Sequence, residues 1–400
     1  MYKQFVSATL LVSALACKTS NQSEQTTLSS DQFAADFLSD DVRRMNPRAE
    51  SGPHCAASPR RLGFTKSPNF SWQDAYSLLW LGWSNLDVTD EYNSGQLSMF
   101  ADWQFDRYKI SENRGSKYSM VFTNEAIYLT FRHSKAITNW LRNLDMRPTG
   151  VRNQAEFSLG VTDIHKGFYD SLNLIWPQIL TDMKVFNPEA KIPIVLAGHS
   201  LGAAQAELAA VGLIKKGYKV RNLYLSGAPR VAGKQWNRLA GELKTADGKP
   251  LRERVYRVTN QSDIIARVPT HKDATSILVQ IPRALTTNQI PDLQLRNATD
   301  SVLKFIVSRA GDTLNIPTYD AIGVHHQLAG SGKVNNSRRA EGATDVDFWQ
   351  RRLDELNTLP NAKVKADEFS RHLSYHFVRY KTGYVCSMLR YFLNEGIAKE

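Results

Sequence analysis

The stretch 194-IVLAGHSLGAAQAELAA-210 holds one serine, Ser200, between two glycines. The apolar run before Ser200 is typical of a strand covered on both faces, and the alanine-rich run after it predicts a helix over 201–216. The pentapeptide 198-GHSLG-202 fits the G-x-S-x-G pattern at such a strand-to-helix turn, where small residues are needed beside the serine. This setting predicts Ser200 as a nucleophile and places the Leu201 N–H at the helix start, facing a developing oxyanion.

Strands and helices alternate on both sides of this stretch. We expect strands at 119–122, 126–131, 192–197, 222–225 and 255–259, and helices at 71–84, 135–145, 167–183 with a kink at Pro177, 298–308 and 345–357. The segment 367–395 is interpreted as a closing strand or helix. Such alternation predicts an α/β fold with a mostly parallel sheet and helices on both faces.

The amino terminus, MYKQFVSATLLVSALAC, joins one lysine to a short apolar run that ends at Cys17. The run is too short to span a bilayer comfortably and is typical of a secretory signal peptide. Its end, 14-ALAC-17, resembles a bacterial lipobox. That resemblance implies acylation of Cys17, a lipid anchor at a membrane surface and, because Lys18 follows, a place on the outer membrane of the cell envelope. An ordinary signal peptide, giving a secreted or periplasmic protein, remains the alternative.

Three regions are expected along the chain: a signal peptide at 1–17, a polar tether and irregular region at 18–60, and one α/β domain at 61–395 with inserts at about 273–320 and 331–365. The formal net charge is +11, but Lys and Arg are scattered and no nucleic-acid-binding motif is present, so we expect no nucleic-acid partner. We expect a monomer. Cys55 and Cys386 either pair or stay free, and the cysteine spacing does not suggest a metal site.

A serine hydroxyl needs a general base, and the base needs an orienting carboxylate. In this type of fold the three residues follow one another as serine, aspartate and histidine. Asp263 comes directly after the strand predicted at 255–259, so it is the candidate acid.

Five ordered segments resemble the class 3 lipase family, which includes the fungal triacylglycerol lipases. They are 127-IYLTFRHSKAITNWLRNLD-145, 164-IHKGFYDSL-172, 193-PIVLAGHSLGAA-204, 223-LYLSGAPRVAG-233 and 256-YRVTNQSDIIARVP-269. The resemblance covers roughly residues 70–385. It implies an α/β-hydrolase fold and a serine lipase or esterase that needs no metal or organic cofactor.

Carried over position by position, the resemblance makes Ser200 the nucleophile and Asp263 the triad acid. The oxyanion donors would be Leu201 and Ser134. The preceding residue, His133, stands where the family commonly has glycine. If that position needs a positive φ, the histidine would be strained there.

Among the histidines that follow Asp263, four are candidates for the base. The family's histidine is often followed by an aromatic residue three to five positions later, and this favours His372, with His376 as the alternative. His325 and His326 lie in a segment that resembles one preceding the family's catalytic histidine, so they are less favoured.

The helix expected at 135–145 carries an apolar face at helical spacing, formed by Ile137, Trp140, Leu141 and Leu144. This face either packs into the core or belongs to a lid that covers Ser200 in water and turns onto a lipid surface.

The sequence therefore predicts hydrolysis of acylglycerol or phospholipid esters at a membrane through an acyl-enzyme. The substituted oxyanion loop and the long inserts motivate an alternative, a non-catalytic lipase-like envelope lipoprotein that binds lipid or protein. An acyltransferase that shares the acyl-enzyme is a third hypothesis.

Overall fold

The computed structural model describes residues 62–84, 105, 107–132, 156–269 and 272–394, the last range with gaps at 279, 282–284, 286–287, 289, 310–318, 330–333, 338–340 and 379–381. Its centre is an eight-stranded sheet in the order β1-β2-β3-β4-β5-β7-β9-β10. The strands are β1 (Arg107–Asn113), β2 (Ser116–Phe122), β3 (Ile127–Phe131), β4 (Ile194–His199), β5 (Val220–Ser226), β7 (Val255–Asn260), β9 (Val324–Leu328) and β10 (Val334–Ser337). The five strands from β3 to β9 are parallel, and the outer strands join them antiparallel.

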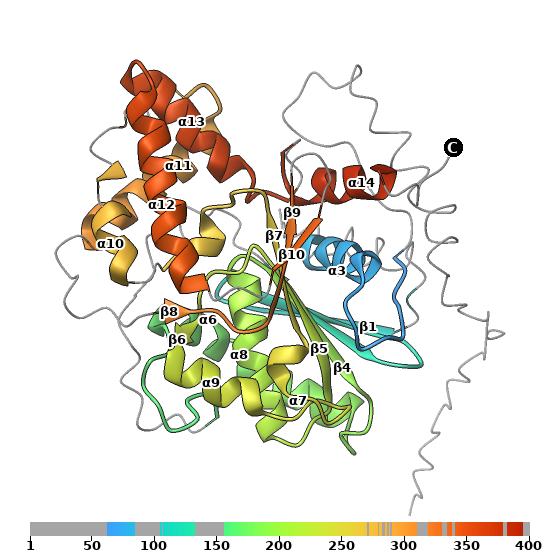
Figure 1. Cartoon of the computed structure of the whole chain (residues 1–400). Helices are drawn as coiled ribbons and strands as arrows, with labels where there is room; N and C mark the ends of the chain where they lie inside the picture. Colours follow the sequence, from blue (N-terminus) through green and yellow to red (C-terminus); the bar gives the residue numbers. More distant parts are fainter. Residues whose placement is uncertain are drawn as a thin grey trace, which may run out of the picture.

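Helices cover both faces of this sheet (Figure 1). The described helices are α3 (Trp72–Ser84), α6 (Lys166–Asn173), α7 (Trp176–Phe186), α8 (Leu201–Lys215), α9 (Lys234–Glu242), α10 (Lys272–Leu278), α11 (Leu293–Arg309), α12 (Glu341–Thr358), α13 (Ala362–Ser374) and α14 (Tyr384–Asn394). A short second sheet pairs β6 (Ala232–Gly233) with β8 (Tyr319–Asp320).

Hydrophobic side chains fill both sides of the sheet because its central strands are buried on both faces. In β4, Leu196 packs into one core, whereas its neighbours Val195 and Ala197 pack into the other, as the two-residue period of a strand requires. Helix α8 belongs to the first core, and α3 and α14 belong to the second. The predicted α/β fold with a mostly parallel, doubly covered sheet is confirmed.

Four helices, α10 to α13, form a group that we call the helical insert. Within it α10 packs on α12, and α13 packs on both α11 and α12. Figure 1 shows these helices gathered at one end of the molecule, beside the sheet and not across one of its faces. The helices expected at 298–308 and 345–357 are parts of α11 and α12, whereas β8 and β10 are short strands within the same inserts.

One expected helix differs from the structure. The single helix expected at 167–183 is two helices, α6 and α7, because the chain turns at Leu174 and Ile175. Pro177 lies in the first turn of α7, where its missing N–H costs no hydrogen bond. Inside one long helix it would remove a backbone hydrogen bond and break or kink the helix. The segment at 367–395, expected as a strand or a helix, contributes the end of α13 and all of α14, with a turn after α13.

Several predictions concern residues outside the described ranges: the signal peptide and Cys17, the tether, His133 and Ser134, and the helix at 135–145 with Ile137, Trp140, Leu141 and Leu144. They stay predictions. Among the helices that the structure does describe, none combines the length and apolarity needed to span a bilayer.

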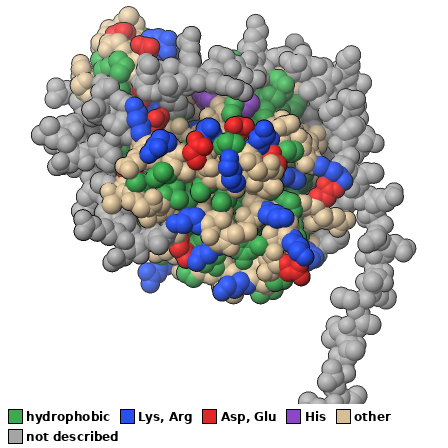
Figure 2. All heavy atoms as spheres, turned by 60° about the horizontal axis from the view of Figure 1, so that its bottom comes forward, with side chains coloured by type: hydrophobic (Ala, Val, Ile, Leu, Met, Phe, Trp, Pro, Cys, Tyr) green, Lys and Arg blue, Asp and Glu red, His purple; other side chains and the backbone are tan. Residues whose placement is uncertain are grey.

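Cys386, on α14, is disulfide-bonded. Its partner cysteine lies outside the described residues, so the pairing with Cys55 stays a prediction. Figure 2 shows the molecule turned so that the bottom of Figure 1 comes forward. On this face Lys and Arg side chains are spread among acidic and apolar ones. This distribution on the visible face agrees with the scattered basic residues of the sequence.

Candidate active site

Ser200 occupies the turn between β4 and α8. Its backbone has φ 57° and ψ −124°, a conformation that costs energy for a residue with a side chain. The turn is held because the Ser200 N–H donates to the Ser226 carbonyl at 3.0 Å and the Ser200 carbonyl accepts from the Ala203 N–H at 3.0 Å. The strand-to-helix turn predicted from the G-x-S-x-G pattern is present, and it puts Ser200 at the carboxyl end of β4.

The two glycines of this turn are required by close backbone packing. A Cβ atom on Gly198 would lie 2.2 Å from the Gly202 carbonyl carbon, and one on Gly202 would lie 2.4 Å from the Phe131 carbonyl oxygen. Any side chain would therefore push α8 away from β4 or β3. The close contact fixes the start of α8, and with it the Leu201 N–H, next to Ser200.

Asp263 lies in the loop after β7 and is buried, with 2% of its surface exposed. Its Oδ1 accepts a hydrogen bond from the Ile265 N–H at 2.8 Å. Its Oδ2 faces the His376 Nδ1 at 2.9 Å and accepts from the Tyr384 hydroxyl at 2.7 Å. A buried carboxylate is stable only when it is paired and hydrogen-bonded, and these three donors meet that need while fixing its orientation.

His376 has the orientation of a general base. Because Asp263 accepts the Nδ1–H, the second ring nitrogen, Nε2, carries the lone pair. Nε2 is buried and has no hydrogen-bond partner among the described residues. The ring centroid lies 4.7 Å from that of His199, the residue directly before Ser200.

Gly227 lies under this pair. It has φ 56°, and a Cβ atom there would lie 3.0 Å from both Asp263 Oδ2 and His376 Cε1. The loop after β5 therefore leaves room for Asp263 and His376 to meet. A larger residue at position 227 would fill that room.

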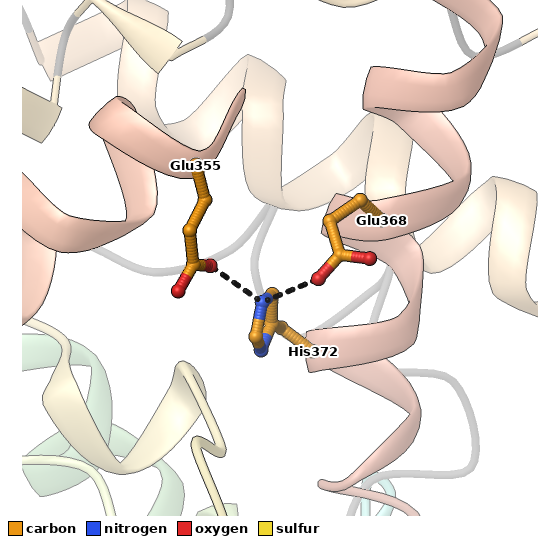
Figure 3. A group of neighbouring side chains, drawn as sticks. All are labelled: Glu355, Glu368 and His372. Atoms are coloured by element: carbon orange, nitrogen blue, oxygen red, sulfur yellow. Dashed lines mark ion pairs between the residues drawn. The ribbon is translucent and has the colours of Figure 1, made fainter. Parts of the chain in front are cut away.

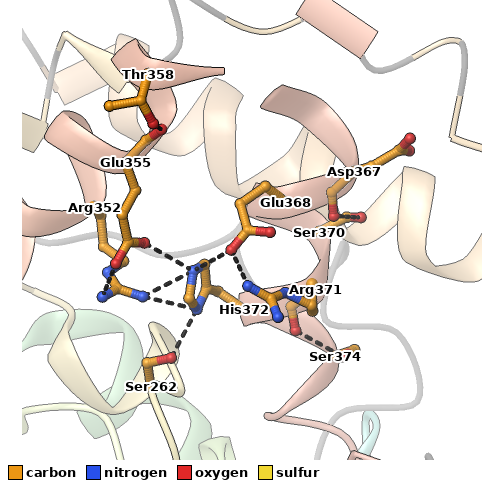
Figure 4. Close-up of polar contacts among 10 residues, drawn as sticks. All are labelled: Ser262, Arg352, Glu355, Thr358, Asp367, Glu368, Ser370, Arg371, His372 and Ser374. Atoms are coloured by element: carbon orange, nitrogen blue, oxygen red, sulfur yellow. Dashed lines mark hydrogen bonds and ion pairs between the residues drawn. The ribbon is translucent and has the colours of Figure 1, made fainter. Parts of the chain in front are cut away.

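The structure does not bring the favoured histidine, His372, to Asp263. The His372 Nδ1 lies 2.7 Å from the hydroxyl of Ser262, and its Nε2 lies 2.9 Å from Arg352 and 3.2 Å from Glu368 (Figure 4). Asp263 instead faces the alternative, His376. The preference for His372 is corrected on this geometry.

The physical reason lies at the end of α13. His372 is still in the helix, whereas His376 follows its last residue, where the chain turns toward β7. The Asn260 side chain at the end of β7 donates to the carbonyls of Tyr375 at 2.8 Å and Thr382 at 2.7 Å. These bonds hold the turn beside the loop that carries Asp263. The spacing of aromatic residues along the sequence gives no sign of them.

The other two candidate histidines lie on β9. His325 hydrogen-bonds Thr259 on the neighbouring strand, and the ring of His326 stacks on Phe70 with centroids 3.6 Å apart. Both contacts are structural, and neither places the ring beside the carboxylate of Asp263 in the way that His376 is placed.

One group in the described residues has ligand spacing for a metal ion. Atoms of Glu355, Glu368 and His372 lie within 4.8 Å of one another (Figure 3). The guanidinium of Arg352 contacts two of them, with Nη2 2.6 Å from Glu355 Oε1 and Nη1 2.9 Å from His372 Nε2. The cationic Arg352 therefore already pairs with the Glu355 carboxylate, and Arg371 pairs with that of Glu368.

Tyr384 is a functional residue that sequence reasoning missed. It begins α14, is fully buried, and has a pKa well above the usual value for tyrosine, chiefly through burial and secondly through the negative charge of Asp263. Its backbone N–H donates to the carbonyl of Phe377, the residue after His376. The aromatic-rich composition of this segment gave no sign of that role.

Residues 128–272 match the class 3 lipase family. A secreted mono- and diacylglycerol lipase A of Penicillium cyclopium is 32% identical over 151 residues, which are 37% of this chain and 44% of that protein. The lipase of Rhizomucor miehei is 30% identical over 152 residues, 37% of this chain and 38% of that protein. The matched segment thus spans less than half the length of these relatives.

A solved structure of the Rhizomucor miehei lipase with its propeptide aligns over 86% of this chain and 92% of that chain, at 16% identity and a TM-score of 0.45. The segment 128–272 is identified as a class 3 lipase sequence, which includes Ser200 and Asp263. It ends before His376, so the histidine is placed by the structure alone.

Proposed function

We propose that this member of the class 3 lipase family is a serine carboxylic-ester hydrolase acting on lipid esters, triacylglycerols or phospholipids, through an acyl-enzyme. The observation that carries the proposal is the buried Asp263–His376 pair beside the strained Ser200 turn. The family match and the relatives named as acylglycerol lipases support the same reaction class.

In the proposed mechanism, the His376 Nε2 takes the proton from the Ser200 hydroxyl as its oxygen attacks the ester carbonyl. Asp263 stabilises the imidazolium that forms and keeps the ring in the required tautomer. The Leu201 N–H stabilises the oxyanion. His376 then gives its proton to the leaving alcohol, and water activated by the same histidine hydrolyses the acyl-serine.

Burial suits this chemistry because charges interact more strongly away from water. His376 and Asp263 are each 2% exposed, so the imidazolium and carboxylate of the intermediate would face one another with little screening. The proposed second oxyanion donor, Ser134, and the proposed lid with Ile137, Trp140, Leu141 and Leu144 complete the site.

The proposed location is the bacterial cell envelope, with Cys17 as a lipid anchor that brings the enzyme to a membrane surface. The disulfide at Cys386 supports an oxidising compartment. Replacing Cys17 with serine is expected to release the protein from the membrane fraction, and retention of the variant there would contradict the anchor.

The function is tested by Ser200→Ala together with labelling by a fluorophosphonate probe and peptide mapping. We expect the wild type to hydrolyse p-nitrophenyl esters and to be labelled at Ser200, and the variant to lose both by a factor of about 10³ or more. Ser276→Ala, at an exposed serine of α10, is the matched control and should behave as the wild type.

A wild-type protein that binds lipid vesicles but neither hydrolyses esters nor reacts with the probe would contradict the proposal. That outcome would favour the non-catalytic envelope lipoprotein.

A further inference from the structure

A cluster of polar side chains lies where α12 and α13 meet the loop after β7. We call it the His372 cluster; it consists of Ser262, Arg352, Glu355, Glu368 and His372 (Figure 4). His372 is central and buried, with 4% of its surface exposed. Its neighbours come from three separate parts of the chain, so the cluster joins the helical insert to the loop that carries Asp263.

Both ring nitrogens of His372 have polar contacts. The Nδ1 lies 2.7 Å from the Ser262 hydroxyl, and the Nε2 lies 3.2 Å from Glu368 Oε1, one turn earlier on α13. A neutral imidazole has one donor and one acceptor nitrogen, and a serine hydroxyl can both donate and accept. Ser262 can therefore bond Nδ1 in either tautomer, whether Nε2–H donates to Glu368 or Nε2 accepts from the Arg352 Nη1 that lies 2.9 Å away. Burial, and after it the charge of Arg352, lowers the pKa of His372 to about 4, so the ring is neutral at pH 7.

Ser262 and His372 each stand close in sequence to one member of the Asp263–His376 pair. Ser262 directly precedes Asp263, and His372 lies four residues before His376. The Ser262–His372 hydrogen bond is therefore a cross-link between the segment that carries the acid and the segment that carries the base. The bond from Asn260 to the Tyr375 carbonyl is a second cross-link between the same segments.

We propose that His372 is a positioning residue, which through Ser262 sets the separation and orientation of Asp263 and His376. This proposal rests on the proposed function, because it assigns His372 a role within the proposed active site. Glu368 and Arg352 contact the imidazole from the other side, so the hydroxyl of Ser262 meets a ring nitrogen that is held in place. A misplacement of about 1 Å in such a pair is enough to cost a large factor in rate.

The experiment compares the wild type with His372→Ala, His372→Gln, Ser262→Ala and the double variant of Ser262→Ala with His372→Ala. Lys363→Ala, at an exposed position of α13, is the matched control. The readouts are kcat and KM for a soluble p-nitrophenyl ester, the thermal midpoint, and the downfield proton resonance of the imidazole N–H bonded to Asp263, assigned by its absence in His376→Gln.

We expect His372→Ala and Ser262→Ala each to lower kcat on the order of 10-fold to 100-fold with KM nearly unchanged. The double variant should be no worse than the worse single variant, because both changes remove the same bond. His372→Gln should recover most of kcat, since its amide can still bond the Ser262 hydroxyl. The downfield resonance should broaden or shift in the alanine variants and stay in the control.

The proposal is overturned if His372→Ala keeps the kcat and the resonance of the wild type, if the two losses add in the double variant, or if a chelator removes activity that zinc restores. The last result would make Glu355, Glu368 and His372 a metal site. A wild type without esterase activity would contradict the proposed function alone, because the resonance still reports whether His372 positions the pair.

Discussion

The Nδ1 of His376 lies 2.9 Å from the Oδ2 of Asp263, although 113 positions separate the two residues in the sequence. Between them the chain forms α10 and α11, rejoins the sheet as β9 and β10, and then forms α12 and α13, which bring it back to the end of β7. The acid and the histidine meet because both ends of the insert are anchored at the end of β7: Asp263 follows that strand, and Asn260 holds the turn that carries His376.

His376→Gln is expected to lower kcat by a factor of about 10² to 10⁴, the range for loss of a general base. Glutamine keeps a donor for Asp263 but has no basic nitrogen in the place of Nε2. Steady-state ester hydrolysis measures the loss, and the thermal midpoint checks that the variant is folded. An active His376→Gln variant would rule this histidine out as the base.

Tyr384→Phe removes one of three hydrogen bonds to the Asp263 carboxylate. Since the carboxylate is buried, losing one donor should lower the free energy of unfolding by about 1–3 kcal/mol. Urea denaturation measures this change. Tyr218→Phe is the control, because its partly exposed hydroxyl does not contact the site, and equal losses in the two variants would contradict the role of Tyr384.

Gly198→Ala is expected to disrupt the Ser200 turn, because the new Cβ would lie 2.2 Å from the backbone of Gly202. Loss of fluorophosphonate labelling together with a lower thermal midpoint is the expected result. At Gly82 in α3, a Cβ would make an ordinary contact of 3.7 Å, so Gly82→Ala should leave labelling intact. Normal labelling of Gly198→Ala would show that the turn tolerates a side chain.

The helical insert is held to the sheet by a buried ion pair. Arg230, in the loop after β5, makes two hydrogen bonds to Asp345 of α12, and both side chains are 1% exposed or less. Asp345→Ala leaves Arg230 buried without its carboxylate, which should cost about 3–5 kcal/mol of unfolding free energy.

The control for this change is Glu242→Ala, which breaks the exposed pair with Arg252 and should cost about 1 kcal/mol or less. Chemical denaturation of both variants gives the comparison. A small effect of Asp345→Ala would contradict this role of the ion pair.

Acid should destabilise the wild type through His372. Its pKa is about 4 in the folded protein against an ordinary value of 6.5, so between these pH values the unfolded chain binds more protons. Stability is therefore lost as the pH falls, by up to about 3 kcal/mol at pH 4.

Comparing the unfolding free energy of the wild type with that of His372→Gln at several pH values isolates this contribution from other titrating groups. The advantage of the wild type should shrink between pH 7 and pH 4.5. A difference that does not change with pH would contradict a neutral, buried His372.

The sequence by itself determined the strand-to-helix turn at Ser200, because the requirements for it are local. A buried strand, two small residues and a helix start stand next to one another at Ser200, and each is readable from neighbouring residues. The parallel sheet followed in the same way from buried strands alternating with amphipathic helices. The break between α6 and α7 was missed because the sequence shows a proline but not whether the chain kinks or turns there.

Only the tertiary structure decided which histidine meets Asp263. His372 and His376 are one helical turn apart and have similar local surroundings, so sequence spacing cannot rank them. The choice depends on where α13 ends, and that end is fixed by Asn260, which lies more than 100 residues away. The same holds for Tyr384 and for the Ser262–His372 bond: each depends on contacts between distant segments, which form only when the helical insert packs back against β7.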